Sequence, residues 1–328
     1  MVTLKEIASL ANVSKSTVSR YLNNGSVSEK TKKKLDKIVK ETGYQPNRLA
    51  QNLKSSKSSM IGVIIPRYDS PSTNMVMKGI DTVAYEENMQ LVITNANLNL
   101  KRTKQNILML QRQKVGAIIL LATTFDEELY QMIKDSPVPI VVIGQELEGY
   151  PSFIYDDYQA GCLIAQHALT LGHKKLLFVG VTEEDYAVGI LRKKGFMDIV
   201  KNAGVSVEFI ESGFSRRDNY QYALKYLPDT EATYIAAATD HIAIGISNAC
   251  AELGISIPHD ISLSGFGGYG ITQSVYPHIT TVNYPFYDMG EIVMKEIVQV
   301  KQTGKKLHSK VTTLPVDLTI QGSTEINK

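Results

Sequence analysis

The stretch SKSTVSRYLNN, residues 14–24, gathers three serines and one threonine around Lys15 and Arg20, and only three of its residues are apolar. Such a segment has too little apolar surface for a typical core helix. Small hydroxyl side chains let a helix settle deep in the major groove, where they bond to phosphates or base edges, and arginine can grip guanine with two hydrogen bonds. This is the chemistry of a DNA recognition helix. The alternative is a polar surface helix of a small bundle.

A second stretch, PRYDSPST at residues 66–73, has the chemistry of an anion site. Arg67, Ser70 and Ser72 lie between a predicted strand and a predicted helix, and backbone amides at a helix start attract negative charge. The same stretch also fits a surface ion pair between Arg67 and Asp69, with serines that cap the helix. The residues alone leave both interpretations open.

The sequence lacks the residue patterns that are typical of enzymes. GxxxxGK[ST], HExxH and GxSxG motifs are absent, and Cys162 and Cys250 give neither a disulfide framework nor a metal-site spacing. The six histidines show no catalytic or metal-ligand spacing: His167, His173, His241, His259, His278 and His308. We therefore expect no enzymatic activity, no bound metal and no cofactor.

Three predicted helices would position the recognition segment. Thr3 and Glu6 are spaced as a capping box, which predicts a helix that begins at Leu4. Ser14 can cap the next helix, and a third helix is predicted from about residue 28 to residue 42. Three short helices with a tight turn between the first two form a helix-turn-helix module.

Charge is divided unevenly along the chain. Residues 1–57 carry 12 Lys and Arg against 4 Asp and Glu, a net charge of +8, whereas the rest carries 23 against 29, a net charge of −6. A small basic segment before a larger acidic one suggests that the basic segment meets a polyanion. The alternative, from charge alone, is a solvated lysine face.

The remainder of the sequence has the pattern of an α/β protein. KSSKSSM, at residues 54–60, has the composition of a linker. Short apolar runs then alternate with amphipathic helical stretches, which predicts parallel strands and enough chain for two lobes. The runs lie at residues 61–65, 91–94, 116–121, 138–143, 175–180, 233–238 and 261–266.

Neither an export signal nor a membrane span is expected. The N-terminus MVTLKEIASL lacks a long apolar run. The longest apolar stretch, VGAIILLA at residues 115–122, is too short to cross a bilayer. We expect a cytoplasmic protein with no membrane partner.

TLKEIASLANVSKSTVSRYLNN, followed by VSEKTKKKLDKIVKETGYQPNRLAQNLK, resembles the head of the LacI family of bacterial repressors. The resemblance implies a DNA-binding head at residues 1–45, a hinge helix and linker at 46–60, and an effector-binding and dimerisation domain at 61–328. In the family, the leucine that matches Leu53 is wedged between base steps by paired hinge helices. The implied DNA-contacting residues are Thr3, Ser14, Lys15, Ser16, Thr17, Ser19, Arg20, Asn23, Thr31, Tyr44, Asn47, Ala50, Leu53 and Lys54.

The rest of the chain resembles the effector domain of the same family, which shares its fold with periplasmic sugar-binding proteins. The resemblance implies an α/β domain of two Rossmann-like lobes, joined by three crossings near Tyr155, Tyr284 and Pro315. A small ligand would bind in the cleft between the lobes, where the strands of open α/β sheets end.

Several residues match the family's ligand contacts. Arg192 matches an arginine that grips sugar hydroxyls, Tyr155 and Phe286 match aromatic cleft residues, and Thr239 and Asp240 match a polar pair at a strand end. The alternatives are core packing for either aromatic ring and helix capping for Asp240.

One departure from the family pattern concerns the ligand's charge. Many relatives carry Gly-Phe-Asp-Asp where this chain has GFGG at residues 265–268, and Gly267 cannot supply the first aspartate's bond to a neutral sugar or base. A carboxylate there would repel an anion, so its absence fits a phosphorylated sugar, although the glycines can also merely reshape the loop. The expected effector residues are Arg67, Asp69, Ser70, Ser72, Tyr155, Arg192, Thr239, Asp240, Gly267 and Phe286.

GFGGYGIT and PSFIYDDYQAG most resemble the sucrose-operon branch of the family, and PRYDSPST resembles the trehalose-operon branch. The resemblance implies a homodimeric repressor that binds roughly palindromic operator DNA and is released by a sugar effector. Sucrose 6-phosphate is expected first, trehalose 6-phosphate second, and unphosphorylated sucrose or fructose third. The alternatives are a catabolite-control regulator with a phosphoprotein partner, a sugar-binding protein without a DNA role, and an enzyme of sugar metabolism.

Overall fold

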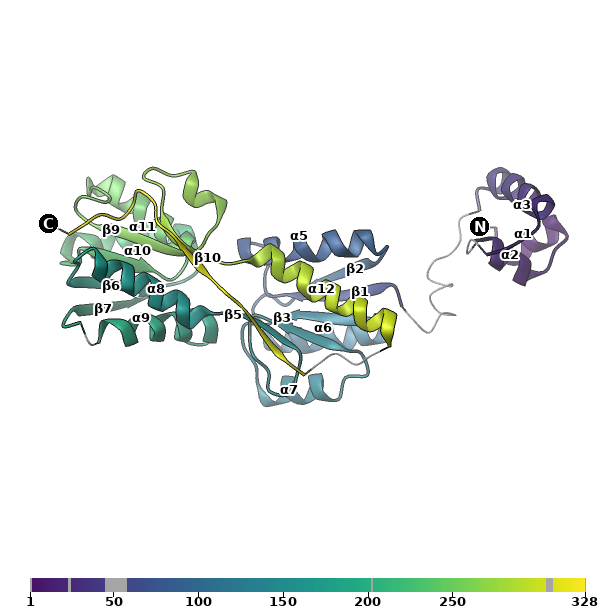
Figure 1. The fold of residues 1–328 in the computed structure, drawn as a ribbon, viewed down its shortest axis with the longest axis horizontal. Helices are drawn as coiled ribbons and strands as arrows, with labels where there is room; N and C mark the ends of the chain where they lie inside the picture. The colour runs from purple at the N-terminus through teal and green to yellow at the C-terminus, as the bar shows by residue number, and fades with distance from the viewer. Residues whose placement is uncertain (1, 23–24, 45–57, 202, 305–308, 328) are drawn as a thin grey trace. The chain divides into compact units, whose positions relative to one another are not determined.

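The structure, a computed structural model, describes residues 2–22, 25–44, 58–201, 203–304 and 309–327. The chain divides into two units, a head at Met1–Ser58 and a body at Ser59–Lys328 (Figure 1). The predicted hinge helix lies outside the described residues. So do five of the predicted DNA contacts, namely Asn23, Asn47, Ala50, Leu53 and Lys54.

Three helices form the head: α1 spans Leu4–Ala11, α2 spans Lys15–Leu22 and α3 spans Glu29–Thr42. The predicted capping box begins α1, because the Thr3 N–H donates to Glu6 Oε2 at 2.7 Å and the Glu6 N–H donates to Thr3 Oγ1 at 3.3 Å. The helices enclose a small apolar core of Ile7, Ala8, Ala11, Val18 and Leu35. The helix-turn-helix prediction is confirmed.

Two six-stranded sheets form the body, one in each lobe (Figure 1). The first lobe has the strand order β11-β5-β4-β3-β1-β2, and the second has the order β12-β10-β9-β8-β6-β7. Neighbouring strands are parallel except β10 and β12, which are antiparallel. The first sheet consists of β1 (Met60–Ile65), β2 (Gln90–Asn95), β3 (Ala117–Leu121), β4 (Ile140–Ile143), β5 (Ser152–Tyr155) and β11 (Val311–Leu314). The second consists of β6 (Lys175–Gly180), β7 (Ser206–Glu211), β8 (Tyr234–Ala237), β9 (Ser262–Gly267), β10 (Thr280–Asn283) and β12 (Asp317–Thr319).

Helices cover the two sheets and pack in pairs, with α5 against α12, α8 against α9, and α10 against α11 (Figure 1). The helices are α5 (Pro71–Glu86), α6 (Leu100–Arg112), α7 (Glu127–Lys134), α8 (Asp157–Thr170), η1 (Tyr186–Leu191), α9 (Arg192–Val200), α10 (Arg216–Tyr226), η2 (Leu227–Asp229), α11 (Asp240–Leu253), η3 (Gly270–Gln273) and α12 (Phe286–Thr303). Within the described residues, none of the helices has the length and apolar character to span a membrane.

Every predicted apolar run forms a strand, so the two-lobed α/β prediction is confirmed. The sequence did not predict β5, β7, β10, β11 and β12, whose short segments mix polar with apolar side chains. β1 begins at Met60, which lies inside the predicted linker, so that linker prediction is wrong at its last residue.

The chain crosses between the lobes three times, as predicted. It passes from β5 to α8 at residues 155–157, from β10 to α12 at 283–286, and from β11 to β12 at 314–317. The predicted crossings near Tyr155, Tyr284 and Pro315 are therefore confirmed. Each crossing brings side chains of one lobe next to the other.

Glycines let the paired helices approach closely, and one such pair fixes a site residue. A Cβ built at Gly161 in α8 would overlap the carbonyl oxygen of Arg192, and one built at Gly195 in α9 would overlap the carbonyl oxygen of Tyr158. The backbone of α9 at Arg192 therefore lies directly on α8. This contact sets where the arginine side chain begins.

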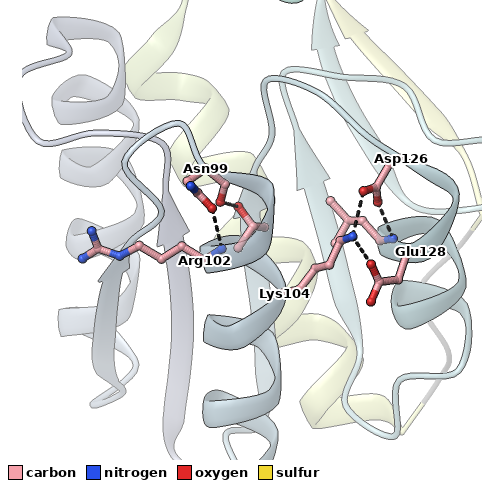
Figure 2. A network of polar contacts seen from close by, with 7 residues as sticks. Asn99, Arg102, Lys104, Asp126 and Glu128 are labelled. Atoms are coloured by element: carbon pink, nitrogen blue, oxygen red, sulfur yellow. Dashed lines mark hydrogen bonds and ion pairs between the residues drawn. The ribbon is translucent and has the colours of Figure 1, made fainter.

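An ion-pair network joins α6 to α7 in the first lobe (Figure 2). Lys104 Nζ donates to Asp126 Oδ2 at 2.7 Å and to Glu128. Asp126 also caps α7 by accepting from the Leu129 N–H at 2.8 Å, and Asn99 caps α6 by accepting from the Arg102 N–H at 3.0 Å. These residues do not line the cleft described below, and the network links the two helices within one lobe.

Candidate functional site

The recognition segment of the head presents small polar side chains to solvent. Ser14 caps α2 by accepting from the Thr17 N–H at 3.2 Å, and its hydroxyl shares hydrogen bonds with Ser16 Oγ at 2.7 Å and Thr17 Oγ1 at 2.9 Å. Ser14, Lys15, Ser16 and Arg20 are exposed, whereas Thr17 and Ser19 are half-buried. The hydroxyl of exposed Ser16 can exchange its bond with Ser14 for a phosphate or base contact.

Other predicted DNA contacts in the head have structural roles already. The Thr3 hydroxyl donates to Glu6 Oε2 at 2.9 Å within the capping box of α1. Thr31 shares a 2.8 Å hydrogen bond with the Ser28 hydroxyl at the start of α3, and Tyr44 packs against the head's core. These three residues stay predictions as DNA contacts.

A cleft with an open mouth lies between the two lobes of the body. Its walls follow the carboxyl ends of strands from both sheets, as in other open α/β proteins. Seven of the predicted effector residues line it: Arg67, Ser70, Ser72, Tyr155, Arg192, Thr239 and Phe286. Asp69, Asp240 and Gly267 do not.

The contacts of Arg67 fit both the surface ion pair and the anion site predicted for residues 66–73. It forms an ion pair with Asp69 at 3.5 Å, where the Asp69 side chain is 80% exposed. Its guanidinium carbon also lies 4.8 Å from the ring centre of Phe214, a residue of the opposite lobe that lines the cleft. Ser70 caps α5 by accepting from the Thr73 N–H at 3.3 Å and shares a 2.9 Å bond with Ser72. A cation and a helix start therefore face the cleft together.

Arg192 is fixed from several sides at the second-lobe wall. Its Nε donates to Asp157 Oδ1 at 2.7 Å, and its Nη1 donates to the Ala238 carbonyl at 2.7 Å. The Tyr284 hydroxyl donates to the same Asp157 oxygen at 2.9 Å, and the guanidinium carbon lies 4.7 Å from the Tyr284 ring centre. The remaining guanidinium N–H groups are the ones that a ligand would meet.

Asp157 was missed by sequence reasoning. It is 3% exposed, lines the cleft and neutralises Arg192. Its neighbour Asp156 instead caps α8 by accepting from the Gln159 N–H at 3.0 Å. The pair of aspartates after an apolar run was the available signal, but sequence alone does not tell which of the two turns inward.

The aromatic wall is packed as a core. Phe286 stacks on Tyr284 with ring centres 5.3 Å apart and planes at 8°, and Tyr269 lies 5.9 Å away. Tyr155 meets Phe286 edge-on at 5.1 Å. The core-packing alternative thus describes these rings well, although both predicted aromatic residues still line the cleft. The buried hydroxyl of Tyr155 has no hydrogen-bond partner among the described residues, and burial raises its pKa well above the usual value.

Asp240 lies under a loop and does not line the cleft, so its role as an effector contact stays a prediction. It accepts from the Tyr269 N–H at 2.9 Å and from the Thr281 hydroxyl at 2.6 Å. Burial raises the pKa of Asp240 to about 6, against the opposing effect of these hydrogen bonds. Thr239, not Asp240, caps α11 by accepting from the Ile242 N–H at 3.3 Å.

Gly267 does not line the cleft either, and its role at the effector site stays a prediction. Its φ is 141°, and a Cβ built there would lie 2.7 Å from the Tyr269 ring. The Tyr269 ring therefore covers the position from which the family's aspartate would extend. The two glycines reshape the loop as well as remove a carboxylate, and Tyr269 takes the place in the cleft wall.

Further polar cleft residues had no recognisable motif. Asp185, Gln145 and His241 all line the cleft. The Gln145 side chain donates to the Thr123 carbonyl at 3.0 Å. Burial lowers the pKa of His241, and the positive charges of Arg216 and Arg67 lower it further, against the opposing charge of Asp69. Polar residues just after predicted strands were the only signal for this set.

Comparison with known proteins identifies the family. Residues 3–47 match the family of bacterial regulatory proteins, lacI family, and residues 165–324 match the periplasmic binding protein-like domain. The sucrose operon repressor of Staphylococcus xylosus is 37% identical over 307 residues, which cover 92% of this chain and 94% of that protein. Catabolite control protein A of Priestia megaterium is 28% identical over 331 residues, which cover 99% of both chains.

The same fold is found in the crystal structure of the lac repressor dimer bound to operator and the anti-inducer ONPF. The TM-score is 0.88 at 24% identity, with 99% of both chains covered. The match extends over the helix-turn-helix head and over the two-lobed body. The chain therefore belongs to the lacI family of bacterial regulatory proteins, which are DNA-binding transcription regulators and not enzymes.

Proposed function

We propose that this regulator is a repressor of a sugar-utilisation operon that leaves its operator when a phosphorylated sugar, first of all sucrose 6-phosphate, binds in the cleft. The observation that carries the proposal is Arg67, a cation just before the start of α5 that lines the cleft between the lobes. The 37% identity to a sucrose operon repressor supports the sugar class.

The proposed DNA surface is the exposed face of α2. Lys15, Ser16 and Arg20 would meet base edges and phosphates in the major groove. Residues 1–45 would act as the DNA-binding domain, residues 46–60 as the hinge, and residues 61–328 as the effector and dimerisation domain. A homodimer would place one head on each half of a roughly palindromic operator, in the cytoplasm.

The proposed effector site has two chemically different walls. The first lobe offers Arg67 with Ser70 and Ser72 for an anionic group, and the second offers Arg192, already neutralised by Asp157, for hydroxyl groups. A ligand that contacts both walls would stabilise one angle between the lobes. Such a ligand shifts the regulator only through a difference in affinity between the DNA-binding and released states.

Other effectors are ranked behind sucrose 6-phosphate. Trehalose 6-phosphate has the same anionic group and comes second, and unphosphorylated sucrose or fructose would leave Arg67 without its anion and comes third. A phosphoprotein co-repressor is the alternative, supported by the 28% identity to a catabolite control protein. It would raise operator affinity rather than lower it.

Fluorescence anisotropy on the promoter DNA next to this gene, at fixed salt, tests the proposal. We expect tight binding by the protein alone and release by sucrose 6-phosphate at lower concentration than by trehalose 6-phosphate or plain sucrose. Failure to bind that DNA would contradict the operator assignment. Tight binding that none of the three sugars disturbs would leave the DNA role and refute the sugar-phosphate role.

A further inference from the structure

Asp185 occupies a place in the second lobe that corresponds to the proposed anion site at the start of α5 in the first. β1 and β6 are each the first strand of their lobe, and each lies second from the edge of its sheet. In both lobes the next helix is capped five residues after that strand ends, by Ser70 after Ile65 and by Asp185 after Gly180. One cap is a neutral hydroxyl beside Arg67, whereas the other is a carboxylate.

The Asp185 carboxylate lines the cleft near the positive charge of Arg192. One carboxylate oxygen accepts a hydrogen bond from the Val188 N–H at 3.1 Å, and this bond caps η1. In the part of the chain that the structure describes, no lysine, arginine or histidine forms an ion pair with it. Burial raises its pKa, partly offset by the Val188 N–H and by the nearby charge of Arg192.

A carboxylate in this setting needs hydrogen-bond donors from the ligand. An unpaired, partly buried carboxylate in a cleft is a candidate functional group, and an ionised carboxylate only accepts hydrogen bonds. Sugar hydroxyls are donors, whereas a phosphate dianion is not and would be repelled by the like charge. Arg67 and Asp185 therefore favour opposite ends of one ligand.

We propose that Asp185 determines ligand specificity and orientation, accepting hydrogen bonds from hydroxyls of the uncharged sugar unit while the anionic group faces Arg67. This inference rests on the proposed function of the same cleft. Asp185, in the loop before η1, would thus provide the sugar-binding carboxylate that many relatives carry at the position of Gly267. In this chain, the Tyr269 ring covers that position.

Asp185→Asn isolates the charge, because asparagine is as good a helix cap as aspartate and can still accept from the Val188 N–H. The matched control is Glu184→Gln, the same chemical change at the neighbouring exposed position, outside the cleft. Isothermal titration calorimetry of the full-length wild type and both variants would use sucrose 6-phosphate and sucrose. Thermal unfolding would show that the variants fold like the wild type.

We expect Asp185→Asn to weaken binding of whichever sugar the wild type binds by about 10-fold or more, as for other hydrogen bonds to charged groups. Glu184→Gln should bind within about 2-fold of the wild type. Combined with Arg67→Gln, the loss of sucrose 6-phosphate binding should be additive, since residues at opposite ends of a ligand act independently.

The outcomes separate this inference from the proposed function. Wild-type preference for sucrose over sucrose 6-phosphate would refute the sugar-phosphate function. The inference about Asp185 would still be tested, by the loss of sucrose affinity in Asp185→Asn. Unchanged affinity in Asp185→Asn would show that the carboxylate only caps η1. Tighter binding of sucrose 6-phosphate by the variant would show the phosphate next to Asp185 and reverse the orientation. Absence of binding by the wild type to either sugar would refute sucrose 6-phosphate as the effector, and Asp185→Asn would then be compared with the wild type for trehalose 6-phosphate.

Discussion

Replacement of Asp157 by asparagine should strongly destabilise the body, because it leaves the buried Arg192 guanidinium without a counter-charge. The two side chains meet at 2.7 Å, with 4% and 8% of their side-chain surfaces exposed. Loss of one partner from such a buried pair costs about 3–5 kcal/mol. Asparagine keeps an oxygen that can accept from Arg192 Nε and the Tyr284 hydroxyl, so the lower end of this range applies to it.

The change is measurable as a melting temperature. A loss of 1 kcal/mol lowers Tm by about 2–4 °C in a domain of roughly this size, so Asp157→Asn should lower it by about 6–12 °C. Circular dichroism during heating is the assay, and urea unfolding gives the free energy independently. Since the chain has no tryptophan, tyrosine fluorescence is the second probe.

A surface ion pair provides the control. Lys175 and Glu231 meet at 2.8 Å, nearly the same distance, but their side chains are 56% and 76% exposed. Glu231→Ala should therefore lower Tm only slightly, because an ion pair that faces water contributes little to stability. If Asp157→Asn cost no more than Glu231→Ala, the reasoning that burial makes the Arg192 pair important would be refuted.

Three further changes have defined outcomes. Asp240→Asn should alter the pH dependence of stability, because the folded pKa of about 6 exceeds the unfolded value of about 3.9. As pH rises from 4 to 7, the wild type should therefore lose up to about 3 kcal/mol of stability relative to the variant. Parallel stability profiles of the two proteins, measured by urea unfolding at each pH, would contradict this. Gly195→Ala forces α9 away from α8 and should cost about 1–3 kcal/mol of stability. It should also weaken effector binding, as measured by calorimetry. Gly213→Ala, where the added Cβ has open space, should change neither stability nor binding. Leu53→Ala should weaken operator binding by anisotropy without weakening sugar binding, and unchanged operator affinity would refute the proposed hinge.

Much of the fold follows from the sequence because buried parallel strands need continuous apolar runs. IGVII at 61–65 and KLLFVG at 175–180 leave few alternatives. β7 escaped prediction for the opposite reason. It lies at a sheet edge, most of its side chains are exposed or half-buried, and its sequence SVEFIE alternates without a run. An edge strand needs only one neighbour and little apolar surface.

The sequence predicts which segments line the cleft, but not which side chains contact one another there. Arg67 follows from the stretch after the first predicted strand and Arg192 from its match to a family arginine, and the structure brings both to one cavity. Which of two adjacent aspartates pairs with Arg192 depends on the inward turn of one residue at the start of α8, which no local pattern encodes. The position of Tyr269 over Gly267 likewise depends on a tertiary contact, since only the folded loop brings the ring there.

Operator release by sucrose 6-phosphate in Arg67→Gln, compared with the wild type, tests most directly whether an anion in the cleft controls DNA binding. Fluorescence anisotropy would first give the operator affinity of both proteins without ligand and then the ligand concentration for half release. We predict equal operator affinity and a rise of about 10-fold or more in that concentration for the variant, because a charge-assisted hydrogen bond is lost. Equal half-release concentrations would contradict the assignment of Arg67 to the effector's phosphate.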